Sequence, residues 1–115
     1  MAPKFDLEER TTKFAKAVIR LCGSLPRGPI NDRLINQVVG SSGSVGTNYR
    51  EANDALGKKD FTQRMKIARR EAKESHHWLS LIEEANKNRA TEIAPLLREA
   101  TELKKILSAI IKKME

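Results

Sequence analysis

The chain has 115 residues, enough for one modest hydrophobic core, so a single domain over residues 1–115 is predicted. Lys and Arg number 22 against 15 Asp and Glu, and the net charge of +7 favours an anionic partner, although it also serves solubility. A single cysteine argues against a disulfide framework, and the charges in the N-terminal decapeptide argue against a signal peptide. No apolar run approaches the roughly 20 residues that span a bilayer, which argues against a membrane partner. A cytoplasmic location is therefore expected.

The first predicted helix covers residues 6–25. Its apolar residues recur at intervals of three and four, as on one helix face: Leu7, Phe14, Val18, Leu21 and Leu25. Lys13, Lys16 and Arg20 fall on the opposite face and form a candidate cationic row. The glycines and prolines of GSLPRGP end the helix.

The second predicted helix covers residues 29–56, with Gly57 as its C-cap. Its apolar side consists of Ile30, Leu34, Val38, Val45, Ala52 and Leu56. Asn48 is expected to lie inside and to hydrogen-bond across the bundle, because a buried amide is costly when unpaired. Arg50 and Glu51 are expected to pair, either within one subunit or between subunits.

The stretch GSSGSVG within this helix has three possible interpretations. A phosphate-binding loop needs a preceding strand and a terminal Gly-Lys-Ser/Thr, and neither is present. A hinge would reset the apolar periodicity, which continues in phase from Val38 to Val45. The pattern therefore favours a narrow helix that neighbours approach closely on more than one face, with Gly43 and Gly46 as structural or interface positions and this helix as the central one.

The third predicted helix covers residues 60–86, and Asp60 with Gln63 resembles a capping box at its start. A heptad-like apolar seam follows: Phe61, Met65, Ala68, Ala72, Ser75, Leu79 and Ile82. Trp78 lies beside this seam and is expected to be structural.

The fourth predicted helix covers residues 91–113, and its apolar stripe takes up about half of its circumference. A helix of a monomeric bundle needs a narrower face, so the excess predicts a homo-oligomer with Ile106 and Ile110 in the interface. Four helices with short connections predict an all-α, antiparallel, up-down-up-down four-helix bundle.

A row of cationic side chains lies on the third helix, away from the seam: Lys59, Lys66, Arg70, Lys73 and His77. A nucleic-acid duplex carries one negative charge per about 1.7 Å of its axis, so such a row can contact several phosphates. The alternative is a solvated face with Glu74 and Glu84 as counterions. Aromatic residues are scarce, which argues against base-specific recognition.

No set of residues has the pattern of an acid–base pair or an activated nucleophile, so no enzyme, cofactor or metal site is expected. The adjacent His76 and His77 point about 100° apart on a helix, whereas a metal-binding pair needs a spacing of three or four. Cys22 is expected to be a small buried residue.

The segments SVGTNYREA and KKDFTQRMKIARREAKESHHWLSLI resemble the four-helix-bundle proteins of the 23S rRNA intervening-sequence family. These are small bacterial proteins, some encoded within insertions in large-subunit rRNA genes, and the family includes the accessory variability determinant of diversity-generating retroelements. The matching residues are Ser44, Asn48, Arg50, Glu51, Ala52, Asp60, Phe61, Ala68, Glu71, Ala72, Glu74, Trp78 and Leu79. The resemblance implies a homopentameric barrel and, for the retroelement branch, binding to nucleic acid and to a reverse transcriptase.

Two functions from different classes remain. The first is a non-enzymatic oligomer that binds RNA or DNA, as an adaptor for a reverse transcriptase. The second is an oligomeric scaffold with a protein partner and no direct role in nucleic-acid binding.

Overall fold

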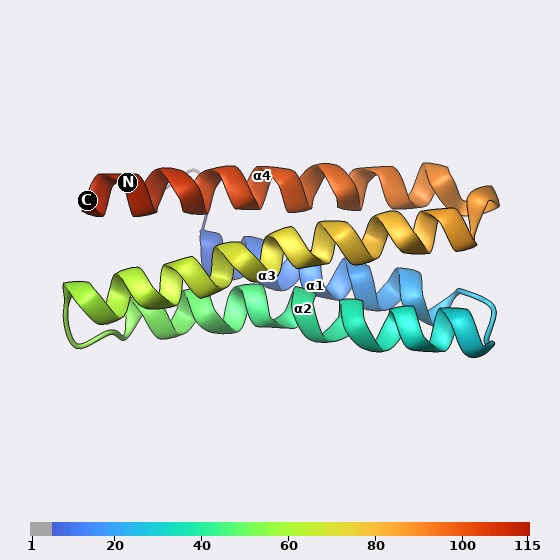
Figure 1. Ribbon diagram of the computed structural model, residues 1–115, viewed down its shortest axis with the longest axis horizontal. Helices are drawn as coiled ribbons and strands as arrows, with labels where there is room; N and C mark the ends of the chain where they lie inside the picture. Colours follow the sequence, from blue (N-terminus) through green and yellow to red (C-terminus); the bar gives the residue numbers. More distant parts are fainter. Residues whose placement is uncertain (1–5) are drawn as a thin grey trace.

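The computed structural model describes residues 6–115, which form four long helices that run alternately up and down (Figure 1). The helices are α1 (Leu7–Gly23), α2 (Pro29–Asn53), α3 (Lys58–Ala85) and α4 (Ala90–Met114). A short 3₁₀ turn, η1 (Lys87–Arg89), joins α3 to α4. Residues 6–115 contain no strand, so the predicted all-α class and the four predicted helices are confirmed.

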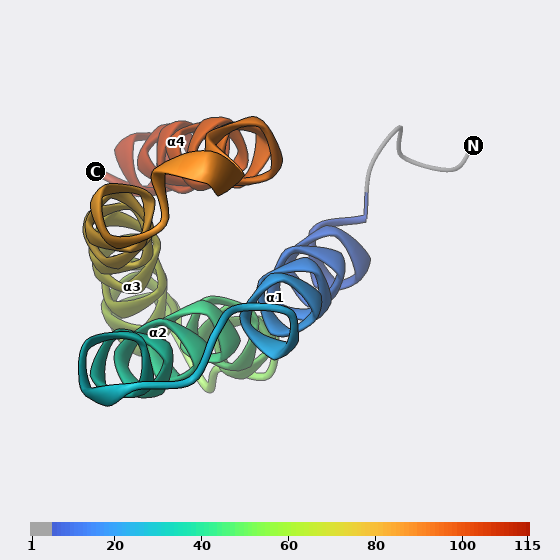
Figure 2. The ribbon, with the colours of Figure 1, turned by 90° about the vertical axis from the view of Figure 1, so that its right-hand side faces the viewer.

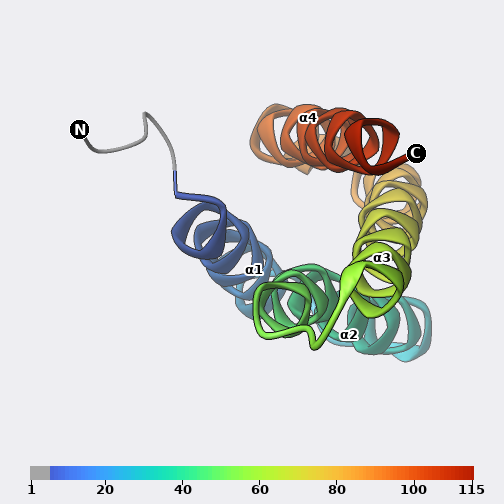
Figure 3. The same ribbon diagram turned by 90° about the vertical axis from the view of Figure 1, so that its left-hand side faces the viewer.

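Seen end-on, the four helices form an open arc, with α1 and α4 at its two ends (Figures 2 and 3). The most extensive packing joins α2 to α3, followed by α3 with α4 and α1 with α2. The contact between α1 and α4 is sparse. The bundle is therefore more open on the α1–α4 side, and α2 and α3 are its inner helices.

The core is built from the apolar faces that the sequence predicts, except that Ile30 at the start of α2 is 67% exposed. The predicted seam of α3 is buried from its second member onward: Met65, Ala68, Ala72, Ser75, Leu79 and Ile82. The same buried cluster also contains Phe14 and Val18 of α1 and Val38 and Val45 of α2. Each large apolar side chain that is fully buried stabilises the fold by about 1.5–3 kcal/mol.

The helix ends differ from prediction around the α2–α3 turn. The second helix ends at Asn53, so Leu56 lies in the turn and is 99% exposed instead of belonging to the apolar face. Gly57 is the N-cap of α3 and not the C-cap of α2, and Asp60 already lies inside the helix. The predicted capping box of Asp60 and Gln63 is therefore wrong, since its Asp does not occupy the cap position.

The glycines of α2 differ in the space around them. A Cβ atom at Gly46 would lie 2.9 Å from Thr11 Oγ1 and 3.3 Å from Thr11 Cβ, so α1 crosses α2 at this point. A Cβ atom at Gly40 or Gly43 would have no neighbour within 4 Å. The predicted close approach is confirmed for Gly46. It is wrong for Gly43 within one chain, because an added Cβ there would contact no atom of another helix among residues 6–115, while its place in an interface between subunits stays a prediction.

The polar residues near the end of α2 bond differently from prediction. Asn48 Nδ2 donates to the Ser44 carbonyl of its own helix at 2.9 Å, a bond within the helix instead of the expected one across the bundle. Within one chain, Arg50 does not pair with Glu51, which is exposed and makes no ion pair among residues 6–115, and pairing between subunits stays a prediction. Instead, Arg50 Nη1 lies 3.1 Å from Glu8 Oε1, so this ion pair joins α2 to α1.

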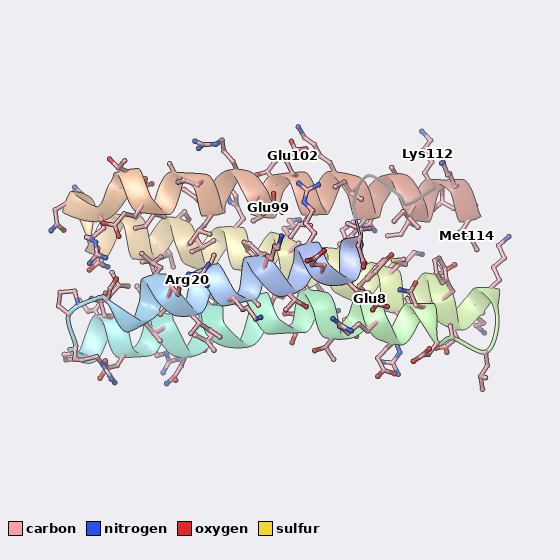
Figure 4. The ribbon with its side chains drawn as sticks, turned by 180° about the vertical axis from the view of Figure 1, so that it is seen from behind. Glu8, Arg20, Glu99, Glu102, Lys112 and Met114 are labelled. Atoms are coloured by element: carbon pink, nitrogen blue, oxygen red, sulfur yellow. The ribbon has the colours of Figure 1, made fainter. Side chains whose placement is uncertain are left out.

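Polar contacts tie the two ends of the arc together. Arg10 of α1 donates through Nε and Nη2 to both carboxylate oxygens of Glu99 on α4, at 2.7 and 2.8 Å. Figure 4 shows Glu99 on the side of α4 that faces α1. At one end of the bundle, Arg89 donates to the carbonyl oxygen of Ser24 at 3.1 Å, which holds the α1–α2 loop against the start of α4. These contacts close the arc where the helices themselves pack sparsely.

Part of the broad apolar face of α4 is accessible in the single chain. Ile93, Leu103 and Leu107 are fully buried, while Ile106 and Ile110 are half-buried at the edge of the core. On α3, Trp78 is also half-buried against the core, which agrees with a structural role.

Candidate nucleic-acid interface

The cationic row predicted on α3 is exposed along its whole length. Its members are Lys59, Lys66, Arg70, Lys73 and His77. None of the four Lys and Arg side chains forms an ion pair within 4 Å in the part of the chain that the structure describes. Glu84, one of the two counterions considered, pairs with Lys87 at 3.4 Å, and Glu74 pairs with no member of the row. The positive charge of the four Lys and Arg side chains is thus available to an external anion.

Three members of this row meet residues of α4 in a groove of about 400 Å³. The groove, called here the α3–α4 groove, is lined by Lys66, Arg69, Arg70, Lys73, Lys104 and Ser108. Five of these six residues are cationic and none is acidic. Cations gathered in one concave site produce a focused positive potential that attracts anions.

Arg69, Lys104 and Ser108 are site residues that the sequence reasoning missed. Arg69 lies three residues after Lys66 and four before Lys73, so helical spacing alone gave a signal for it. Lys104 and Ser108 share one face of α4 by the same rule, but their place opposite Arg70 depends on the register between the two helices. That register follows from tertiary packing and has no local signal in the sequence.

Two predicted members of the row lie outside the groove. Lys59 lies at the start of α3 in a separate hollow of about 550 Å³, beside Leu56 and Gly57. The ring of His77 makes an edge contact with Trp78, with ring centroids 5.1 Å apart. These two residues extend the exposed row but do not line the concave site.

The groove can hold phosphate through charge-assisted hydrogen bonds. An arginine offers two parallel N–H donors to a pair of phosphate oxygens, and a lysine contributes a mobile point charge. Beside the groove, the pKa of Glu71 is raised, first because the carboxyl group is partly buried and then because Glu74 carries a like charge. The positive charge of Arg70 acts in the opposite direction and lowers the pKa of Glu71, so this acid lies within the electrostatic reach of one cation of the groove.

The second predicted row, on α1, is separate and less available. Lys13 Nζ lies 3.8 Å from Glu9 Oε2, so its charge is partly offset. Arg20, labelled in Figure 4, lines a hollow that also contains Glu92. Helices α1 and α3 do not pack against each other, so the two rows do not form one continuous surface.

The other groups considered for chemistry are Cys22 and the His, Cys, Asp and Glu side chains that could bind a metal. Burial raises the pKa of the Cys22 thiol to about 11, which keeps it protonated at neutral pH. Across residues 6–115, no cluster of three or more His, Cys, Asp and Glu side chains is placed to hold a metal ion. None of the described helices combines the length and the apolar character needed to cross a bilayer.

Comparison with known proteins gives one family and a similar fold. Residues 4–109 match the family model described as 23S rRNA-intervening sequence protein. A crystal structure at 1.70 Å from Bacteroides thetaiotaomicron VPI-5482, of a protein of unknown function from the S23 ribosomal protein family, has a TM-score of 0.81 and 28% sequence identity. The similarity covers 93% of this chain and 99% of the other. No curated protein matches the sequence significantly.

Proposed function

Because the chain belongs to the 23S rRNA-intervening sequence protein family, we propose that it is a non-enzymatic, oligomeric accessory protein that binds the phosphate backbone of RNA or DNA. The observation that carries this proposal is the α3–α4 groove, where five cations and a serine gather without a carboxylate. The row on α3 continues the positive surface beyond the groove toward the start of the helix, with Lys59. A backbone that passes over this surface meets one cation after another.

Recognition of this kind is electrostatic and independent of sequence. The groove contains no aromatic side chain on which a base can stack, so binding comes from phosphate contacts. Each neutralised phosphate releases counterions, which steepens the slope of log affinity against log salt by about 0.9 per contact. Lys66, Arg70 and Lys73 together account for a slope of about 2.7 for each engaged subunit.

The test is fluorescence anisotropy with a labelled duplex and a labelled structured RNA over a salt series. The variant carries Lys66→Gln, Arg70→Gln and Lys73→Gln, which remove two lysines and one arginine from α3. We expect a strong loss of affinity and a shallower salt slope, while circular dichroism and the oligomeric state stay unchanged because these side chains are exposed.

The matched control carries Lys13→Gln, Lys16→Gln and Arg20→Gln, which remove the same three charges from α1. Its affinity should fall much less, because only the general field of the protein is weakened. If the two triple variants behave in the opposite way, the binding surface lies on α1. If the parent protein does not bind either nucleic acid at low salt, the proposal is wrong.

A reverse transcriptase is the protein partner that we propose, by analogy with the retroelement accessory protein. A cationic surface can hold the RNA template while another face contacts the enzyme. A reverse-transcriptase gene beside the gene for this protein, and co-purification of the two products after nuclease treatment, would support this role. Retention that disappears with nuclease would mean that nucleic acid bridges them and that no direct contact exists.

The second candidate function is an oligomeric scaffold with a protein partner, and exposed apolar side chains favour it. Ile19 on α1 is 55% exposed and Val39 on α2 is 37% exposed, and both line a hollow of about 560 Å³ between these helices. We propose that such surfaces, with the half-buried face of α4, assemble the chain into a homopentamer. Normal assembly without any nucleic-acid binding would favour the scaffold.

A further inference from the structure

The lining of the α3–α4 groove suits an anion with several acceptor oxygens, such as phosphate. All six side chains are hydrogen-bond donors, while none is aromatic, apolar or acidic. A nucleobase finds no ring on which to stack and no carboxylate to accept its amino groups. A ligand held in this groove is therefore recognised through its phosphate oxygens.

The shape of the groove limits the width of the ligand. Packed helices have axes about 8–10 Å apart, and the groove is the furrow between two such helices. The major groove of B-DNA alone is about 12 Å wide, so a duplex is too broad to enter the furrow and can only lie across it. A single chain of phosphates is narrow enough to lie along it.

The density of positive charge in the groove indicates which kind of phosphate chain fits it best. The α3 side of the groove runs from Lys66 to Lys73, about 10 Å along the helix axis. One strand of a duplex presents one phosphate per about 3.4 Å, hence about three over this length. The groove has five cations, none in an ion pair among residues 6–115, which is more positive charge than such a strand neutralises. In a condensed phosphate chain a single bridging oxygen, instead of a sugar, separates neighbouring phosphates, so its negative charges lie closer together and match this density better.

We infer that the α3–α4 groove is a binding site for a linear oligophosphate, such as the triphosphate of a nucleotide or of an RNA 5′ end, or free polyphosphate. Arg69 and Arg70 offer paired donors from α3, and Lys104 and Ser108 close the groove from α4. The inference rests on the proposed function, since both use the same cations of α3, but it specifies a phosphate chain inside the furrow instead of a backbone lying over it.

Isothermal titration calorimetry of the full chain with inorganic tripolyphosphate tests this site. Orthophosphate and sulfate at the same ionic strength serve as controls for charge alone. We expect tripolyphosphate to bind at least about tenfold more tightly than either of them. The variant with Arg69→Gln and Lys104→Gln should lose about tenfold in affinity for tripolyphosphate.

The matched control carries Arg98→Gln and Lys112→Gln, one arginine and one lysine that are exposed on α4 outside the groove. Its affinity for tripolyphosphate should stay within about twofold of the parent, because only the long-range field changes. An equal loss in both variants would mean that the binding is diffuse and would overturn the site.

Two further ligands separate the possible sources of the phosphate chain. ATP reports on a nucleotide tail, and one RNA prepared with either a 5′-triphosphate or a 5′-hydroxyl reports on an RNA end. Preference for ATP or for the triphosphorylated RNA identifies the source, and binding of inorganic chains alone indicates free polyphosphate. Equal affinity for the two RNAs, together with tripolyphosphate binding no tighter than sulfate, overturns this inference and leaves the proposed function standing. Tripolyphosphate binding without any RNA binding overturns the proposed function and leaves this inference standing.

Discussion

The contact between Thr11 and Gly46 fixes how closely α1 can approach α2. Thr11 is fully buried, and its hydroxyl donates to the Leu7 carbonyl at 2.7 Å, so the side chain has little freedom to move away. A methyl group at Gly46 would meet this hydroxyl at 2.9 Å. The absence of a side chain at Gly46 is therefore a packing requirement of the α1–α2 crossing.

Gly46→Ala should lower the free energy of unfolding by about 1–2 kcal/mol, although alanine favours the helix by about 1 kcal/mol. Gly43→Ala is the matched control, because its new methyl group enters open space and should raise stability by up to about 1 kcal/mol. Urea denaturation of both variants measures the difference. Equal stabilisation by the two substitutions would show that Thr11 moves aside without cost.

The sequence could identify the group of small residues in α2 but not which of them is crowded. Three glycines at a spacing of three are equivalent by periodicity and propensity. Only the line along which α1 crosses α2 distinguishes Gly46 from Gly40 and Gly43, and that line results from the packing of the whole bundle. For the same reason, the partner of Arg50 was not predictable, since Glu8 lies 42 residues away in the chain.

Glu71 provides a test of pH dependence. Its pKa is raised above the usual 4.5 because the carboxyl group is partly buried near Glu74, so the folded state holds the proton more tightly than the unfolded chain. Ionisation of Glu71 therefore destabilises the fold. The destabilisation is fully present at a pH above the raised pKa, and it is absent at a pH well below 4.5, where the carboxyl group is protonated in both states. Glu71→Gln should raise the melting temperature at neutral pH, and this gain should vanish in acid. Glu84→Gln, at an exposed position, is the control and should show no such gain in a series of melts from neutral to acid pH.

At the scale of the helices, the Arg10–Glu99 ion pair holds α1 to α4 more than helix–helix packing does. The Arg10–Glu99 pair is bidentate, and both side chains are about one-quarter exposed, at 27% and 28%. Such a pair contributes more than a solvated one, because water competes less for its hydrogen bonds.

Glu99→Gln should lower the free energy of unfolding by about 1–2 kcal/mol, since it removes the negative charge and one of the two oxygens that accept from Arg10. Glu9→Gln is the control, because its 3.8 Å contact with Lys13 joins two largely exposed side chains. Its effect should stay below about 0.5 kcal/mol. Chemical denaturation of both variants decides, and equal effects would mean that the Arg10–Glu99 pair adds nothing to the attachment of α1.

The helices themselves were predictable because their apolar residues recur with helical spacing over many turns. Their ends were less predictable, as the α2–α3 turn illustrates. Leu56 continues the apolar phase of α2, yet the chain has already left the helix and the side chain is solvated. The α3–α4 groove had a local signal on α3 alone, because the contribution of Lys104 depends on how α4 aligns with α3.

For the whole molecule, the half-buried apolar side chains of α4 predict assembly in solution. We expect sedimentation equilibrium at micromolar concentration to give a homopentamer, and Ile110→Gln to weaken it by placing a polar amide in the interface. Leu56→Gln, at a 99% exposed position in the turn, is the control and should leave the assembly intact. A well-folded monomer of the parent protein would contradict the proposed oligomer.

The open arc has a consequence for the folding rate. Each helix packs chiefly on its neighbours in the sequence, and the contact between α1 and α4, the two helices farthest apart in the chain, is sparse. Two neighbouring helices can pair from their connecting turn outward, so each new contact closes little additional loop, and helical bundles of this kind fold in microseconds to milliseconds. We expect folding of the single chain within this range in rapid-mixing experiments at low concentration, with the Arg10–Glu99 contact forming late. Glu99→Gln should then accelerate unfolding and leave the folding rate almost unchanged.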